Sequence, residues 1–140
     1  MKKMFIAILS LPILITSCSS NIVPKSYDYE DIDYLTISWS EIFDVPMVDY
    51  FVYVYSPTCG HCQKIKQDIL NYAIHHDNFR FVLFNKDIPV LEDVTGTIGK
   101  NTVDDIGIKG TPSLFEIYDG VLIKNIVGST AILETLTNLH

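Results

Sequence analysis

Two cysteines separated by two residues, in the tetrapeptide Cys59-Gly60-His61-Cys62, are the side chains of this sequence best suited to chemistry. Residues three apart on a helix lie close together, so the two sulfur atoms can form a disulfide and release it again. At the start of a helix a cysteine has a pKa between about 3.5 and 7.5, against about 8.5 for a free thiol. The spacing therefore predicts redox chemistry, with Cys59 as the attacking thiolate and Cys62 as the thiol that resolves the mixed disulfide.

The two residues between the cysteines are expected to be part of the catalytic site. Gly60 is expected to permit the tight start of the helix. His61, when positively charged, would stabilise the Cys59 thiolate and so favour the reduced protein, which makes the disulfide more oxidising. The cysteine pair would itself be the redox group, and we expect no other cofactor.

Zinc is the alternative ligand for such a cysteine pair, with His61, His75 and His76 as further candidates. Tetrahedral zinc needs four ligands, and neither a second pair of cysteines nor a suitably spaced histidine pair completes the set. We therefore expect no metal site. His75 and His76 are expected to close a helix, because cations suit a helix C-terminus.

Hydrophobic periodicity predicts the elements that position the pair. Residues 48–55 are almost all apolar or aromatic, which indicates a buried central strand leading into the tetrapeptide. A helix follows, and a second buried strand over 79–84 implies a right-handed parallel crossover. The helix is predicted from the apolar residues Ile65, Ile69, Tyr72 and Ala73; before the first buried strand we expect a short strand at 34–36 and a short helix at 38–43.

The second half of the chain predicts a hairpin and a final helix. Asp119-Gly120 is the two-residue turn typical of a hairpin. Residues 85–100 show no regular pattern and are expected to form a loop with room for a helix. The expected elements are a short helix near 101–107, strands over 113–118 and 121–127, and a last helix after Gly128 whose apolar face holds Ile132, Leu133, Leu136 and Leu139.

On these motifs the chain resembles the thioredoxin superfamily over roughly residues 34–140, with the CGHC tetrad of protein disulfide isomerase domains. Gly110-Thr111-Pro112 matches the cis-proline position of that family. The resemblance implies an α/β thioredoxin fold, a central mixed sheet flanked by helices on both faces, and thiol-disulfide oxidoreductase activity. It also implies that Thr111 and Pro112 bind an extended substrate and that Thr111 tunes redox behaviour. The segment 55–59 is similar to the bacteriocin transport accessory proteins.

The sequence departs from the family pattern in three places. Tyr53 stands six positions before Cys59, where the family usually buries an acidic residue that carries the proton of the resolving thiol. Proton transfer must then use water or another group. Thr58 replaces the usual aromatic residue before the first cysteine, and the region 85–100 is longer than the family normally needs.

The N-terminus indicates export. Two lysines precede an apolar run that ends at Ile15 and is too short to span a bilayer. The following residues lead into Cys18 in a pattern that resembles the bacterial lipobox, with an ordinary signal peptide as the alternative. We expect a signal peptide over 1–17, a lipid on Cys18, a flexible tether over 18–33 and a domain over 34–140, held at the extracytoplasmic face of the cell membrane.

Composition limits the remaining classes of function. With 140 residues, 48% of them hydrophobic, the chain has room for one domain with a real core. The net charge of −7 argues against nucleic-acid binding. We expect a monomer that exchanges disulfides with exported proteins or peptides and with a membrane redox partner of unknown identity. The alternative is a non-catalytic thioredoxin-fold accessory protein for peptide or bacteriocin export.

Overall fold

A four-stranded sheet organises the computed structural model, which describes residues 25–139. The strands lie in the order β2-β1-β3-β4; β1 pairs with β2 in parallel and with β3 antiparallel, and β3 pairs antiparallel with β4. The strands are β1 (Asp49–Tyr55), β2 (Phe79–Leu83), β3 (Ser113–Tyr118) and β4 (Val121–Val127), the α-helices are α1 (Gly60–His75) and α2 (Ser129–Thr137), and the 3-10 helices are η1 (Tyr29–Leu35), η2 (Trp39–Glu41), η3 (Thr95–Thr97) and η4 (Val103–Asp105).

Local signals in the sequence explain the strand connections. Asp119 and Gly120 both have positive φ, 51° and 73°, as a two-residue hairpin turn between antiparallel strands requires. Gly128, with φ 92°, ends β4 and precedes α2. The parallel pair β1 and β2 is joined through α1, so the predicted strand, helix, strand unit and hairpin are both confirmed.

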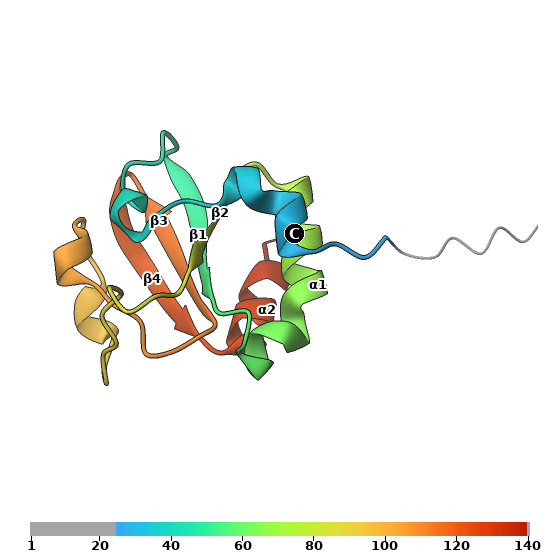
Figure 1. Ribbon diagram of the computed structural model, residues 1–140. Coiled ribbons are helices and arrows are strands. Elements are labelled where there is room, and N and C mark those ends of the chain that lie inside the picture. Colours follow the sequence, from blue (N-terminus) through green and yellow to red (C-terminus); the bar gives the residue numbers. More distant parts are fainter. Residues whose placement is uncertain (1–24, 140) are drawn as a thin grey trace, which may run out of the picture.

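One face of the sheet is covered by the two α-helices and by η1, as Figure 1 shows. Alternate residues of β1 point to this face, and they are aromatic: Phe51, Tyr53 and Tyr55. They pack with Phe79 and Phe81 of β2 and with the apolar side of α1. Since α1 begins directly after β1, this packing fixes the place of both cysteines.

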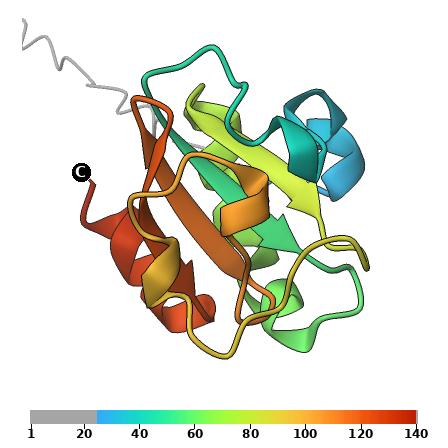
Figure 2. The same ribbon diagram turned by 90° about the vertical axis from the view of Figure 1, so that its left-hand side faces the viewer.

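The opposite face is covered by short 3-10 helices and loops, which lie in front of the sheet in Figure 2. The other residues of β1, including Val52 and Val54, contribute to a second and more aliphatic cluster there. Tyr50 belongs to this cluster, and its buried hydroxyl donates to the carbonyl of Ile42 at 2.7 Å. Both faces therefore carry helices, as expected, but the α-helices that the structure describes lie on one face.

The segment before β1 differs from its prediction. A strand was expected at 34–36, but η1 occupies 29–35, and Thr36 forms only one isolated bridge, to Phe81. Residues 29–33 fall in the expected tether, yet Ile32 and Leu35 are buried against α1. The acidic residue Asp28 caps η1, as half of a capping box, and also pairs with Lys66 of α1 at 2.7 Å.

The region 85–100 forms a loop that includes the short helix η3, as the lack of a regular pattern predicts. It returns along the outer edge of β4, where the Gly99 N–H donates to the carbonyl of Leu122 and the Leu122 N–H donates to that of Lys100, both at 2.8 Å. These bonds satisfy backbone groups of an edge strand. Within residues 25–139 none of the helices has the length and apolar character needed to cross a bilayer.

Candidate active site

Cys59 and Cys62 lie at the junction of β1 and α1, where the sequence places them. Cys59 is the N-cap of α1, and its sulfur accepts a hydrogen bond from the Cys62 N–H at 3.3 Å. Both cysteines are free thiols. Cys59 is half-buried and can be reached by another molecule, whereas Cys62 is 0% exposed.

The surroundings of Cys59 favour its ionised form. Burial alone would raise the pKa of this thiol, but hydrogen bonds from the Cys62 thiol and from Thr111 outweigh it and lower the pKa below the ordinary value. The backbone N–H groups of Cys62 and His61 act in the same direction. These are the free N–H groups of the first helical turn, which suit an anion.

The pKa of Cys62 is shifted in the opposite direction. Burial, followed by its interaction with Cys59, raises the pKa of Cys62 to about 11. At neutral pH Cys62 therefore keeps its proton, and Cys59 is the thiol of the pair that ionises more readily. This split gives the two thiols the different reactivities that the attacking and resolving steps of disulfide exchange require.

The Thr111-Pro112 segment lies directly against Cys59, although it is 52 residues away along the chain. The peptide bond between Thr111 and Pro112 is cis. The protonated Cys59 thiol donates to the carbonyl of Thr111 at 3.2 Å. A hollow of about 460 Å³ opens beside these groups, lined by His61, Gly110, Thr111, Pro112 and residues 127–131.

His61 and Gly60 differ in how far the structure supports their expected roles. The His61 side chain is exposed and borders this hollow, and the residue acts on Cys59 through its backbone N–H. The effect of its imidazole charge stays a prediction. Gly60 does not have positive φ, and a Cβ there would meet nothing within 4 Å. The helix start therefore does not require glycine, and a catalytic role of Gly60 stays a prediction.

Two tyrosines that the sequence analysis did not assign to the site lie near the cysteines. Tyr53 of β1 and Tyr29 of η1 pack in the same apolar cluster as Cys62. A negative charge on Cys62 contributes to raising the pKa of both phenols, after burial as the larger cause. Strand alternation could have placed Tyr53 on this face, because it shares a side with Phe51 and Tyr55. No local pattern indicates Tyr29.

Two of the three histidines of the zinc alternative, His75 and His76, make contacts at the end of α1. The Nδ1 atom of His75 contacts the Asn71 carbonyl at 2.7 Å, and that of His76 contacts the Tyr72 carbonyl at 2.7 Å. Both contacts are to carbonyls at the end of α1, where a cation is favourable. In the part of the chain from 25 to 139, no three His, Cys, Asp or Glu side chains are grouped so as to hold a metal ion.

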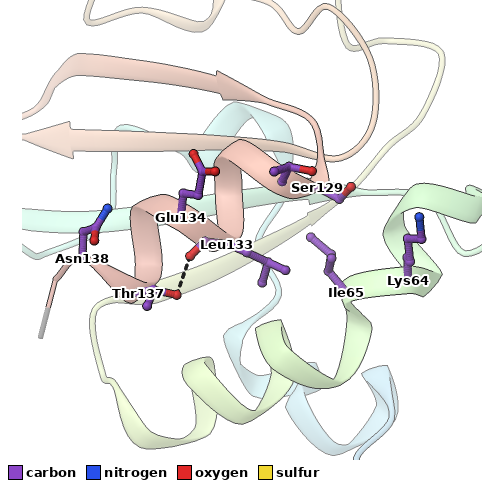
Figure 3. A pocket seen from close by; sticks show the side chains of 8 residues that line it. Lys64, Ile65, Ser129, Leu133, Glu134, Thr137 and Asn138 are labelled. Carbon is purple, nitrogen blue, oxygen red and sulfur yellow. Dashed lines mark hydrogen bonds between the residues drawn. The ribbon is translucent and has the colours of Figure 1, made fainter.

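A second hollow, of about 420 Å³, lies between α1 and α2 (Figure 3). Lys64 and Ile65 line it from α1, and Leu133 and Glu134 line it from α2. Neither cysteine borders this hollow, so we place the candidate chemistry at Cys59 and Thr111. Cys18, the expected lipidation site, and the expected signal peptide lie outside the described residues.

Comparisons with known proteins identify the fold. No family model matches the sequence, and no curated protein matches it. Among solved structures, thioredoxin NaTrxh from Nicotiana alata superposes with a TM-score of 0.50 and 18% identity, covering 75% of this chain and 90% of that chain. Thioredoxin f from spinach chloroplast has a TM-score of 0.49 and 10% identity, covering 81% and 96%. Plasmodium falciparum thioredoxin has a TM-score of 0.49 and 13% identity, covering 75% and 98%.

The likeness to the Nicotiana alata protein is one of shape, since the identity is low. It agrees with the four-stranded mixed sheet and with the helices that cover it. This chain has the thioredoxin fold.

Proposed function

We propose that this protein is an extracytoplasmic thiol-disulfide oxidoreductase that exchanges disulfides with exported proteins or peptides through Cys59 and Cys62. The observation that carries the proposal is that the pKa values of the two thiols are shifted in opposite directions. The pKa of the accessible Cys59 is lowered, and that of the buried Cys62 is raised to about 11. The thiolate is the attacking species in disulfide exchange, so at neutral pH the accessible sulfur is the reactive one.

The exchange proceeds in two displacements. The Cys59 thiolate attacks one sulfur of a partner's disulfide; a bond forms between Cys59 and that sulfur, and the other sulfur leaves as a thiolate. Cys62 then loses its proton and attacks Cys59, forming the Cys59-Cys62 disulfide and releasing the partner's second sulfur as a thiolate. The partner disulfide is reduced by two electrons and the cysteine pair is oxidised. Run in reverse, the same steps oxidise a partner dithiol.

Thr111 and Pro112 are proposed to hold the partner during these steps. The Thr111 carbonyl lies 3.2 Å from the Cys59 sulfur, and the hollow beside it reaches the start of α2. An extended peptide lying there can pair with backbone groups next to the reacting sulfur. The lowered pKa of Cys59 stabilises the reduced form of the cysteine pair, which shifts the exchange toward oxidation of partner thiols relative to a pair with an ordinary thiol.

The function can be tested with two assays on the full chain. The wild type should reduce insulin and should oxidise reduced ribonuclease. The Cys59→Ser variant should have neither activity. Cys62→Ser should form mixed disulfides that do not resolve. A protein that is inactive in both assays but still binds a secreted peptide would instead be an accessory protein of this fold. A redox titration of the cysteine pair separates an oxidase from a reductase.

The membrane location is proposed from the N-terminal sequence alone, where Cys18 follows a short apolar run. Labelled palmitate should be incorporated into the wild type but not into Cys18→Ser. Release of the wild type into the medium, without incorporation of label, would leave an ordinary signal peptide as the explanation.

A further inference from the structure

The buried hydroxyl of Tyr53 has no hydrogen-bond partner. Tyr53 is 0% exposed, and within residues 25–139 its oxygen is one of the few buried polar side-chain atoms left unpaired. Leaving a buried polar group unpaired is costly, so native structures rarely do it. Tyr50 on the same strand is equally buried, but its hydroxyl donates to Ile42 at 2.7 Å.

The resolving thiol is the group that acts most strongly on the Tyr53 hydroxyl, after burial itself. Tyr53 and Cys62 belong to the same cluster on the helix-covered face, and both are 0% exposed. After burial, the largest cause of the raised pKa of Tyr53 is a negative charge on Cys62, and the Cys62 side chain raises it further. The ring is held in place between Tyr55, at a centroid distance of 6.1 Å, and Phe81, at 5.8 Å.

We propose that Tyr53 is a positioning residue for disulfide exchange: its unpaired hydroxyl donates a hydrogen bond to the Cys62 sulfur whenever that sulfur becomes a thiolate. This inference rests on the proposed function. When Cys62 attacks Cys59, or leaves it with the bonding electron pair, the negative charge lies at a fully buried sulfur. A donor that is already in place stabilises that charge without any rearrangement.

Tyr53 donates a hydrogen bond in this step and does not transfer its proton. Burial raises the pKa of Tyr53 well above its usual range, so the phenol keeps its proton throughout the exchange. The proton of Cys62 leaves for water or for the departing partner thiolate. The other groups acting on Cys62 and Tyr53 are Cys59 and Thr111, the backbone of Ser56, and the Tyr29 hydroxyl from η1.

The proposal is tested with Tyr53→Phe, which removes only the hydroxyl, and with Tyr50→Phe as the matched control on the opposite face. Both are made in the full chain carrying Cys18→Ser, so that Cys59 and Cys62 are the only thiols. The reduced proteins react with excess dithiobis(nitrobenzoate). Cys59 releases the first coloured thiolate by attacking the reagent, and Cys62 releases the second by attacking Cys59.

We expect the first release to be unchanged in Tyr53→Phe, and the second to be about tenfold slower with its pH midpoint moved upward, since a hydrogen bond to a charged group contributes about 1.5 kcal/mol or more. Tyr50→Phe should match the parent in both releases. A second release at the parent rate and with the parent pH profile in Tyr53→Phe would overturn the proposal. Failure of the parent to release any thiolate through Cys59 would instead overturn the proposed function.

Should Tyr53→Phe disturb folding, the Cys62 pKa is measured directly in Cys59→Ser, with the phenols replaced throughout by fluorotyrosine. The more acidic phenol is a stronger donor and should lower the Cys62 pKa. An unchanged Cys62 pKa would count against Tyr53 as the donor.

Discussion

The two faces of the sheet are built from the same strands but differ in chemistry. The loop-covered face holds a mostly aliphatic cluster, in which the buried hydroxyl of Tyr50 is paired. The helix-covered face holds the cysteine pair and stacked aromatic rings, and it leaves the hydroxyls of Tyr29 and Tyr53 unpaired. Within the described residues, the loop-covered face also leaves one buried atom unpaired, Oδ1 of Asn125, but the two unpaired tyrosine hydroxyls lie in the cluster that holds the reactive thiols.

The largest expected effects separate reactivity from stability. Cys59→Ser should remove all disulfide exchange, because the attacking thiolate is lost, and should leave the free energy of unfolding nearly unchanged. Ile117→Ala on the loop-covered face should lower the free energy of unfolding by about 2 to 5 kcal/mol through the cavity it leaves. Its Cys59 should still react with a disulfide reagent at the wild-type rate below the unfolding transition. Urea denaturation and single-turnover kinetics measure the two effects, and loss of Cys59 reactivity in folded Ile117→Ala would break the separation.

The pH dependence of stability should come from the helix-covered face. The pKa of Cys62 is raised to about 11, so as the pH rises from about 9 the unfolded chain loses this proton before the folded protein does. Stability of the reduced protein should therefore fall, by up to about 2 kcal/mol. Cys59 affects the pH dependence of stability with the opposite sign, because its pKa is lower in the folded protein than in the unfolded chain. It stabilises the fold at pH values above its unfolded pKa. This stabilisation is lost as the pH falls through its folded pKa.

Urea denaturation of wild type and Cys62→Ala at pH 8 and pH 10 checks the contribution of Cys62. The fall should be smaller in Cys62→Ala. Equal falls in the two proteins would place the pH-sensitive group elsewhere.

The paired and unpaired tyrosine hydroxyls predict changes of opposite sign. Tyr50→Phe should lower the free energy of unfolding by about 1 kcal/mol, because the buried Ile42 carbonyl loses its donor. Tyr53→Phe should raise that free energy in the reduced protein by about 1 kcal/mol, because an unpaired buried hydroxyl is removed. Thermal or urea unfolding of the two variants checks both signs. Destabilisation by Tyr53→Phe would mean that its hydroxyl is paired in the resting protein.

The smallest expected effect concerns Gly60. A Cβ at this position meets no atom within 4 Å and the backbone does not have positive φ, so alanine fits. Gly60→Ala should stabilise the protein by about 0.5 kcal/mol, because alanine loses less backbone freedom on folding. Disulfide exchange should stay at the wild-type rate. A marked loss of exchange would show that a partner approaches this backbone closely.

The sequence predicts the elements that depend on local signals. The run of apolar residues in β1, the periodicity of α1 and the Asp119-Gly120 turn each specify their element through neighbouring residues. The segment η1 was missed because its acidic residues are typical of a solvated tether. Its structure depends on α1, where Gln67 exchanges hydrogen bonds with the backbone of Tyr27 at 3.0 and 2.8 Å and Lys66 pairs with Asp28.

The residues of the candidate site also differ in whether the sequence alone indicates them. The tetrapeptide spacing indicates Cys59 and Cys62 directly, and the family resemblance indicates Pro112. Whether Tyr53 and Tyr29 belong to the site depends on which tyrosine hydroxyls are hydrogen-bonded in the folded protein. The spacing of residues in the sequence does not predict this.

The most direct test of the account is the ionisation of Cys59. The reduced full chain is treated with iodoacetamide across a pH series, and alkylation of each cysteine is followed by mass spectrometry. We predict that Cys59 reaches half its maximal rate at a pH below the value near 8.5 of a free thiol, while Cys62 stays unmodified over the same range. Half-maximal alkylation of Cys59 at the free-thiol value would contradict the account.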